Sequence, residues 1–452
     1  MKIRQLLTIL LALFLSAHIA KAQNVLTLDV ATNLATPWEI LWGPDDYIWV
    51  TERAGKVSRV NPENGQQQVL ITIPGVIEQS ESGLLGMALH PEFSSNPHVF
   101  LAYTYLKNNR ITEKIVRYEY ADDKLQNEVV LLDDITGYQN HVGCRLVFGP
   151  DNKLYVSTGD AGNANLSQNR NSLNGKILRM NTDGSIPDDN PFGNSYVWAT
   201  GSRNAQGLVW ANGKLYGSEH GPSSDDEVNI YAEGRNYGWP NVVGFCNTPG
   251  EQQFCNDSNV VEPLYGWTPT LGVCGIDYYK SGNVPFGQWQ NSLLLTSLKA
   301  GRFTVLHLSE DGEKIEKTQD FLVNRFGRLR DVCVSPQGRV FIATSNRDGR
   351  GNPAANDDRI IELRSGLSAN EDAHIYNLPK ILQNPASHNI TINELENNML
   401  TEVFDISGKR YFVQSRPQKQ LNIDCTGWPN GMYIIKYQLN DAVATQKVII
   451  RH

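Results

Sequence analysis

The chain has 452 residues and a formal net charge of -8 at pH 7, and its 40 Lys and Arg residues are scattered along the sequence. Nucleic-acid-binding domains gather their cations on one face, so this composition argues against a nucleic-acid partner. The length exceeds the roughly 100–200 residues of a typical domain, which predicts one large domain with a small appendage.

The first 22 residues have the pattern of a secretory signal peptide. Two cations precede an apolar run over residues 6–15, and Ala20 and Ala22 mark a cleavage point after Ala22. This run is too short to span a bilayer, and no other stretch reaches the ~20 apolar residues of a membrane helix. We predict that residues 1–22 are a signal peptide rather than a buried first helix, and that the mature chain is exported without a transmembrane segment.

Export permits disulfides, and the chain contains six cysteines. Their spacing matches no zinc-binding pattern and does not choose among the possible pairings. Cys246 and Cys255 bracket a short polar segment, which favours a local bridge between them. Cys333 lies in an apolar strand, where a free buried thiol and a bridged one are equally compatible with the pattern.

A repeated phrase marks the central part of the chain: an apolar strand, a turn rich in Pro, Asp, Asn or Gly, and a second alternating strand. Copies occur at residues 41–52, 89–105, 147–160, 209–219 and 334–345. Repeated hairpins without helical periodicity favour radial blades, each of about 40–50 residues. We predict an all-β fold with a six-bladed β-propeller over residues 23–367, in which long inserts such as residues 231–273 are loops on the face of the site.

The sequence changes character after the predicted propeller. Residues 368–380 read as a linker, and residues 381–452 contain short alternating segments typical of a small β-sandwich. The order NPAS, ISGKR and GMYIIKY resembles the C-terminal sorting domain of type IX secretion cargo, which implies transport through the periplasm and then to the cell surface by that machinery. A carbohydrate-binding sandwich is the alternative, but Trp428, the one Trp in this segment, offers no aromatic platform.

His141 and Asp160 form a candidate catalytic pair. His141 precedes one predicted strand and Asp160 follows its hairpin partner, so both belong to the same end of one blade. A carboxylate that contacts an imidazole fixes its tautomer and raises its basicity for proton abstraction. The pairing makes a catalytic role about as well supported as a structural one.

Two other segments depart from the blade pattern. Arg203 and Asn204 lie in a Gly-flanked turn that is either an ordinary surface turn or a ligand contact. Trp267 is either a core residue or a planar wall for a flat ligand.

Backbone carbonyls and cations provide two further candidate sites. Gly221 and Pro222 can present carbonyl oxygens to a calcium ion, whereas the acidic run 225–227 beside them is usually a solvated turn. Lys299, together with the two arginines of the R-x-R at residues 328–330, would suit a ligand with several carboxylates, although an isolated R-x-R is usually a solvated edge.

The motifs resemble the soluble quinoprotein glucose and aldose sugar dehydrogenases, the glucose/sorbosone dehydrogenase family. The resemblance runs from about Ala35 to Leu363 and rests on HVGCRLVFGPD at His141, GSRNAQG at Arg203, HGP, SLK and RLRDV. It implies an enzyme that uses calcium-bound pyrroloquinoline quinone (PQQ) to oxidise the C1 hydroxyl of aldose sugars to lactones. The electrons would pass to an acceptor that the sequence does not name.

The resemblance implies a role for each candidate. His141 would be the base on the C1 hydroxyl, Asp160 would orient it, and Arg203 would stabilise charge on the quinone oxygen. The residues implied to hold the cofactor are Arg203, Asn204, His220, Trp267, Lys299, Arg328 and Arg330. The implied metal ligands are Gly221 and Pro222 at the cofactor calcium, and Glu227 and Tyr237 at a second, structural calcium site.

The sequence departs from the glucose-named enzymes around the expected sugar site. Glu81 replaces a Gln, Asn140 replaces an Asp, and His220 replaces a Gln beside the calcium carbonyls. Glu81 and Asn140 are therefore the expected substrate contacts, and the set fits the broader aldose branch better.

Two other classes of function are compatible with parts of the sequence. A non-catalytic propeller could bind a glycan or a protein on the same face, since fold does not fix function. A calcium-dependent propeller hydrolase would need a calcium held by side chains at the channel centre, for which the sequence offers no obvious set. The combination of base, carbonyl pair and cofactor clamp favours the dehydrogenase, and no dinucleotide fingerprint suggests a nicotinamide or flavin.

Overall fold

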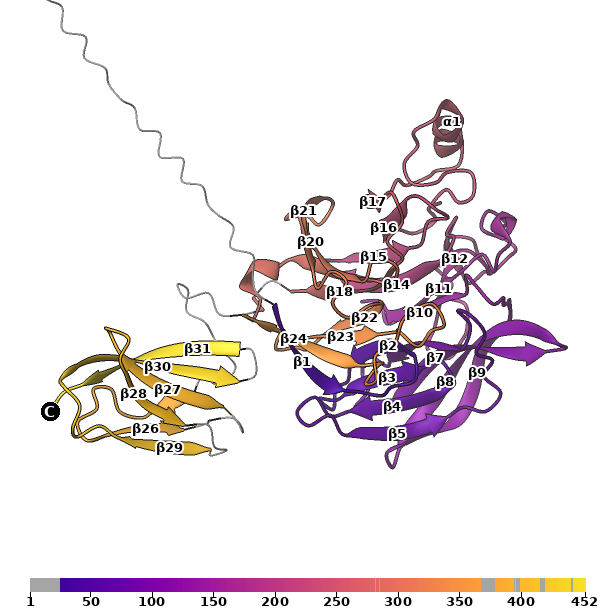
Figure 1. Ribbon diagram of the computed structural model, residues 1–452. Helices are drawn as coiled ribbons and strands as arrows, with labels where there is room; N and C mark the ends of the chain where they lie inside the picture. The colour runs from indigo at the N-terminus through magenta and orange to yellow at the C-terminus, as the bar shows by residue number, and fades with distance from the viewer. Residues whose placement is uncertain are drawn as a thin grey trace, which may run out of the picture. The chain divides into compact units, whose positions relative to one another are not determined.

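The computed structural model describes residues 25–280, 282–283, 285–366, 379–393, 395, 399–414, 419–439 and 442–452. The predicted signal peptide and almost all of the predicted linker lie outside these residues. The chain divides into two compact units, a large one that contains Val25–Arg364 and a small one that contains Pro379–His452 (Figure 1). Within the described residues, no helix combines the length and apolar character that crossing a membrane requires.

Six four-stranded antiparallel sheets form the first unit within the described residues. The first three are β2 (Pro37–Trp42), β3 (Ile48–Glu52), β4 (Lys56–Val60) and β5 (Gln67–Thr72); β6 (Leu84–Leu89), β7 (His98–Lys107), β8 (Arg110–Ala121) and β9 (Lys124–Thr136); and β10 (Gly143–Phe148), β11 (Leu154–Thr158), β12 (Lys176–Met180) and β13 (Val197–Thr200).

The other three sheets follow in chain order and complete the circle. They are β14 (Ala205–Ala211), β15 (Lys214–Glu219), β16 (Asp226–Tyr231) and β17 (Tyr265–Trp267); β18 (Val273–Tyr279), β19 (Ser292–Ser297), β20 (Arg302–Leu308) and β21 (Ile315–Phe321); and β22 (Leu329–Val334), β23 (Val340–Thr344), β24 (Ile360–Ser365) and β1 (Val25–Ala31). Short 3-10 helices lie at Ala164–Leu166 and Gly287–Trp289.

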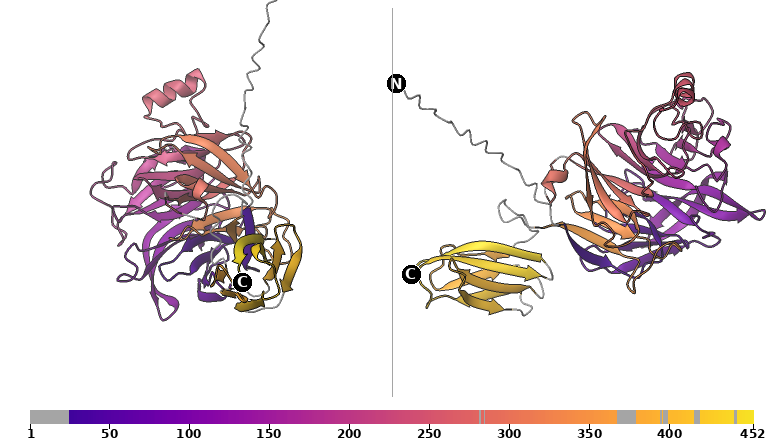
Figure 2. Two further views of the ribbon diagram at one scale, coloured as in Figure 1. Left: turned by 90° about the vertical axis from the view of Figure 1, so that its left-hand side faces the viewer. Right: turned by 45° about the horizontal axis from the view of Figure 1, so that its top comes forward.

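The inner strands form a closed ring. In turn, β2 contacts β6, β6 contacts β10, β10 contacts β14, β14 contacts β18, β18 contacts β22, and β22 returns to β2. The first strand of the unit, β1, pairs with β24 and so completes the last blade. Figure 2 shows the same arrangement from two further directions. The prediction of an all-β, six-bladed propeller is confirmed.

Packing between blades explains why several strands are buried along their whole length. Every residue of β3, β11, β12 and β23 is buried, because both faces of these strands meet neighbouring blades. Trp49, Trp289 and Phe303 are fully buried between blades. Polar residues such as Glu52 and Lys176 are buried at strand ends, where we find the hydrogen-bonding network of the site.

The insert between β16 and β17 was predicted to be a loop, and this prediction is wrong in part. It contains helix α1 (Pro249–Asp257), and its end supplies β17, the outer strand of the fourth blade. Thr248 caps the helix, and its side chain and that of Glu251 form a reciprocal capping box. The Thr-Pro-Gly-Glu sequence carries this signal, with Pro at the first helical position.

The predicted local disulfide is present, and it joins Cys246, which precedes helix α1, to Cys255 within the helix. Within the described residues, the remaining cysteines are free and buried, namely Cys144, Cys274, Cys333 and Cys425. The structure thus resolves the alternative left open for Cys333 in favour of a free thiol.

In its described residues, the C-terminal unit contains two small sheets that lie as two layers (Figure 1). One holds β25 (Lys380–Ile381), β26 (Asn389–Asn393) and β29 (Gln420–Asp424); the other holds β27 (Leu400–Asp405), β28 (Arg410–Gln414), β30 (Gly431–Leu439) and β31 (Ala442–Ile450). Ile390, Val403 and Ile435 are fully buried in this unit. Trp428 is half-buried beside Tyr411, with ring centroids 5.1 Å apart, so it is not an isolated aromatic.

Candidate active site

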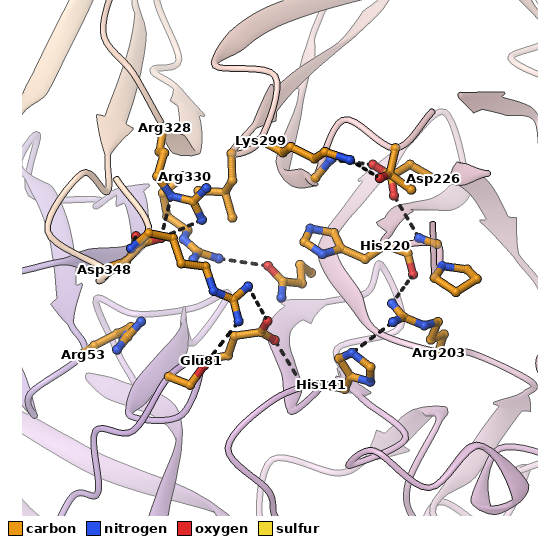
Figure 3. A pocket seen from close by; sticks show the side chains of 18 residues that line it. Arg53, Glu81, His141, Arg203, His220, Asp226, Lys299, Arg328, Arg330 and Asp348 are labelled. Atoms are coloured by element: carbon orange, nitrogen blue, oxygen red, sulfur yellow. Dashed lines mark hydrogen bonds and ion pairs between the residues drawn. The ribbon is translucent and has the colours of Figure 1, made fainter. Parts of the chain in front are cut away.

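A polar cavity of about 370 Å³ opens on one face of the propeller (Figure 3). Its lining comes from residues that precede inner strands, such as His141 before β10, and residues that follow second strands, such as Lys299 after β19. In an antiparallel blade these two positions lie at the same end. The fold therefore gathers short polar segments from different blades around one space.

The structure brings His141 and Asp160 together. His141 Nδ1 lies 2.8 Å from Asp160 Oδ1, which also accepts a hydrogen bond from the Gly162 amide at 2.8 Å. Asp160 Oδ2 accepts from Trp239 Nε1 at 2.9 Å. Burial raises the pKa of Asp160, but the hydrogen bonds from His141, Gly162 and Trp239 outweigh it and hold that pKa below its usual value. Asp160 is thus an ionised, fully engaged partner of the imidazole.

The second ring nitrogen of His141 faces the cavity. Arg203 Nη2 lies 3.0 Å from His141 Nε2, and Arg203 Nη1 donates to the His220 carbonyl at 2.9 Å. A guanidinium has only donors, so His141 Nε2 accepts and the ring proton is on Nδ1, toward Asp160. This tautomer leaves a lone pair on Nε2 available to a donor in the cavity.

Glu81 places the backbone of His141. Its Oε2 accepts from the His141 amide at 3.0 Å, and His141 has a φ of 55°, which is unusual for a residue other than glycine. Burial raises the pKa of Glu81, whereas the His141 amide and the nearby His220 and Arg350 lower it, with a net decrease. Glu81 therefore stands beside the base as a carboxylate.

Asp226 holds the turn that carries Gly221 and Pro222. One carboxylate oxygen accepts from the Gly221 amide at 2.9 Å, and the other accepts from the amides of Leu271 at 2.7 Å and Gly272 at 2.6 Å. A Cβ at Gly221 would come within 2.0 Å of the Ser224 carbonyl oxygen, so the turn requires glycine. Sequence reasoning treated Asp226 as part of a solvated run, but it is fully buried.

Lys299, Arg328 and Arg330, the three cations implied to hold the cofactor, all line the cavity. Lys299 Nζ donates to Thr270 Oγ1 at 3.0 Å, and Arg328 Nε donates to Asp348 at 2.7 Å. Arg330 is buried, and its Nη1 donates to Gln206 Oε1 at 2.9 Å. Three cations from two blades thus converge on one space, which suits a ligand with several carboxylates.

A second, much smaller cavity of about 10 Å³ lies behind Gly221 and Pro222, and Glu227 and Tyr237 both line it. Burial, together with the nearby Glu219, raises the pKa of Glu227 to about 8. Glu227 Oε1 accepts from the Gly244 amide at 2.9 Å. The Tyr237 hydroxyl is occupied, because it donates to the Ile230 carbonyl at 2.6 Å.

Besides Asp160 behind His141, and Glu227 and Tyr237 at the smaller cavity, three predicted site residues do not line the main cavity. Asn204 is fully buried behind it, where its Oδ1 accepts from the Gly143 amide at 3.1 Å. Trp267 lies in the outer strand β17 and packs against Tyr265. Asn140 lies outside the lining residues, but its side-chain oxygen accepts from Ser80 Oγ at 2.7 Å at the rim.

The cavity also contains residues that sequence reasoning missed, including Arg53, Gln206, Asp348 and Arg350. Arg53 directly follows β3, and Asp348 and Arg350 lie in the loop after β23; both strands are the second strand of a blade. Asp160, His220 and Lys299 occupy the same place in their own blades. Applying that rule to every copy of the repeat would have found Arg53 and the loop of Asp348.

Several buried nitrogens at the cavity lack a partner. Within the described part of the chain, these are Arg53 Nε, Arg203 Nε, His220 Nε2 and Arg330 Nε. Burial lowers the pKa of His220 despite the nearby Asp226 and Glu81, which favours a neutral ring. Buried donors without a partner are costly, so the cavity is suited to an acceptor-rich ligand.

The fold is a six-bladed propeller, and one face holds a cation-rich cavity with the His141–Asp160 pair beside it. These features define the protein as a propeller with an enzyme-like site. The chain belongs to the glucose/sorbosone dehydrogenase family, whose model matches residues 34–354, and it carries a secretion system C-terminal sorting domain at residues 380–451. The family and the sorting domain predicted from the motifs are confirmed.

Individual relatives of this chain carry names from the same family. Quinoprotein glucose dehydrogenase B of Acinetobacter calcoaceticus is 34% identical over 73% of this chain and 87% of its own. An aldose sugar dehydrogenase of Escherichia coli is 30% identical over 69% of this chain and 88% of its own. The PQQ-bound aldose sugar dehydrogenase of Streptomyces coelicolor superposes with a TM-score of 0.66 at 33% identity, over 76% of this chain and 99% of that one.

Proposed function

We propose that this chain is a calcium- and PQQ-dependent dehydrogenase that oxidises the C1 hydroxyl of aldose sugars to lactones at the cell surface. The observation that carries the proposal is His141, whose Nε2 faces the cavity as an acceptor while Asp160 holds its other nitrogen. The relatives named as quinoprotein and aldose sugar dehydrogenases support the same reaction class.

The residues present fit the quinone. PQQ carries three carboxylates, and Lys299, Arg328 and Arg330 supply cations on one side of the cavity. The unpartnered Arg203 Nε and Arg330 Nε are donors that an oxygen-rich ligand would satisfy. The carbonyls of Gly221 and Pro222, in a turn fixed by buried Asp226, are the oxygen donors that a calcium ion prefers. When bound, the quinone with its calcium supplies the acceptor for the hydride from C1.

The chain's own residues handle the proton. A C1 hydroxyl that donates to His141 Nε2 would take the position that Arg203 Nη2 now occupies, 3.0 Å from that nitrogen. His141 then takes the hydroxyl proton, and the imidazolium that forms is stabilised by Asp160 at 2.8 Å. Arg203 stays beside this position, where it would stabilise the negative charge that develops on the quinone oxygen. The hydrogen bond from Trp239 Nε1 keeps Asp160 in place throughout.

The small cavity at Glu227 is proposed as a second, structural calcium site. A buried carboxylate whose pKa is raised to about 8 has too few cationic partners, and a calcium ion would supply the missing charge. The sorting domain supports export by type IX secretion, with delivery to the cell surface.

The test is to purify the full mature chain, add calcium and the quinone, and follow dye reduction with several aldoses. We expect cofactor-dependent turnover that produces the lactone. His141→Ala should abolish turnover and leave quinone binding intact, because His141 is assigned to the sugar proton. Arg328→Gln with Arg330→Gln should instead weaken quinone binding. Tight glycan binding without cofactor-dependent turnover on any sugar would refute the dehydrogenase and support a binding propeller.

A further inference from the structure

Arg350 reaches across the rim of the cavity from the loop that follows β23. Its side chain is 56% exposed, and its partners come from a distant part of the chain. Nη1 lies 3.3 Å from Glu81 Oε1, while Nη2 lies 3.3 Å from Ser80 Oγ and 3.4 Å from Asn140 Oδ1. All three distances are at the long end for hydrogen bonds. The guanidinium is thus loosely held and open to an incoming ligand.

The backbone beneath this side chain is firmly placed. Asp348 accepts from the Arg350 amide at 2.9 Å through one carboxylate oxygen and from Arg328 Nε at 2.7 Å through the other. A Cβ at Gly351 would come within 2.5 Å of the Asn346 carbonyl oxygen and 2.9 Å of Arg328 Cδ. The loop therefore packs tightly on Arg328, and the freedom at Arg350 belongs to its side chain.

Arg350 is separated from the base by a single residue. Glu81 contacts Arg350 through Oε1 and the His141 amide through Oε2. A sugar whose C1 hydroxyl meets His141 would extend toward this rim, where Glu81 and Asn140 offer acceptors for hydroxyls and Arg350 offers donors. Arginine is the side chain whose paired donors best match a carboxylate.

The charge of the cavity favours an anionic sugar. Six cationic side chains line it, against the carboxylates of Glu81, Asp226 and Asp348. A tricarboxylate cofactor with one calcium ion adds about one net negative charge, so a positive excess remains after it binds. Asp348 already neutralises Arg328. The exposed Arg350 has only a long contact with a carboxylate, 3.3 Å from its Nη1 to Glu81 Oε1.

We propose that Arg350 determines substrate specificity and that the preferred substrates are aldoses that carry a carboxylate, the hexuronic acids, over the matching neutral hexoses. This rests on the proposed dehydrogenase function. The guanidinium would turn from its long contacts with Ser80 and Asn140 to the sugar carboxylate, and Glu81 and Asn140 would accept from ring hydroxyls.

The experiment compares glucuronic acid with glucose, which differ only at C6, in the protein loaded with calcium and quinone. We expect kcat/KM to be about ten-fold higher for the acid, the size of one charge-assisted hydrogen bond. Arg350→Gln should lower the ratio of the two kcat/KM values about ten-fold. The matched control is Arg110→Gln at an exposed hairpin end outside the cavity, which should leave the ratio unchanged.

Binding is measured separately with methyl glucuronoside and methyl glucoside, whose blocked C1 hydroxyl prevents oxidation. The loaded protein should bind the glucuronoside more tightly, and this preference should weaken in Arg350→Gln and with added salt. Turnover of glucose with no preference for the acid, or a preference that survives Arg350→Gln, would overturn the inference and leave the dehydrogenase standing. Absence of turnover on both sugars would instead refute the proposed function, while the two methyl glycosides still test Arg350.

Discussion

Asp160→Asn is the sharpest test of the proposed base, because the change is nearly isosteric and its effect follows from three contacts. Asp160 accepts from His141 Nδ1, the Gly162 amide and Trp239 Nε1. An asparagine has one acceptor oxygen, so its NH₂ group must face at least one of these donors. If it faces His141, it drives the ring proton to Nε2 and removes the lone pair that takes the sugar proton.

The magnitude follows from the charge that forms on His141. Asp160 is 2% exposed, so its attraction for the imidazolium is little screened by solvent. With ~4 Å between charge centres and an effective dielectric constant of about 20, that attraction is about 4 kcal/mol. Because each ~1.4 kcal/mol in the barrier is a factor of ten, we expect kcat to fall about 10³-fold.

The assay is dye reduction by the loaded protein, with quinone binding followed by its absorbance and folding by thermal denaturation. Quinone affinity should change little, because Asp160 does not line the cavity. The control is Asp122→Asn, in an exposed turn with a φ of 50° that asparagine also tolerates. A fall in kcat of less than about three-fold in a folded, quinone-binding variant would refute the role of Asp160, since general-base effects are about 10²–10⁴-fold.

Three further predictions concern stability and calcium. The pKa of Asp160 is lower in the folded than in the unfolded chain. The contribution of Asp160 to stability is therefore complete above its unfolded pKa of about 3.9 and is lost as pH falls through the folded value. Acid unfolding curves of Asp160→Asn should lack this loss. Lys176 is fully buried and donates to the carbonyls of three residues at 2.6 to 2.9 Å. Lys176→Met should therefore cost about 2–4 kcal/mol in urea denaturation, and the exposed Lys124→Met should cost little. The pKa of Glu227 is raised to about 8, so this side chain should release a proton when calcium binds near pH 7. Titration calorimetry in two buffers should show that Glu227→Gln releases fewer protons. The control is the exposed Glu233→Gln, which should release as many protons as the parent chain.

Most of the propeller could be predicted from sequence because a blade is built from local alternation and tight turns. Each of the five copies of the repeated phrase corresponds to the first two strands of a blade. The blade of β18–β21 was not predicted because the connection between Tyr279 and Ser292 is longer than the turns of the other copies and carries two aromatic residues. There Phe286 and Trp289 stack at 3.8 Å and are fully buried. The sixth blade was therefore inferred from length rather than from its own sequence.

Helix α1 was missed for a different reason. A nine-residue helix with no buried residue has no apolar stripe, so periodicity could not reveal it. Its local signals are the capping box and the N-terminal Pro, which also occur in polar loops.

For the site, the sequence determined which residues stand at strand ends, since each strand and turn is specified by its neighbours. That sufficed to place His141 and Asp160 at one end of one blade, and to mark Lys299 and Arg328. Only the tertiary structure decided which of these ends meet. Arg350 and Glu81 are 269 residues apart and touch because the ring closes, with β1 completing the blade of β22–β24. Ring closure depends on packing between blades, and no local sequence pattern predicts that packing. The contacts at the rim of the cavity therefore could not be predicted from any single motif.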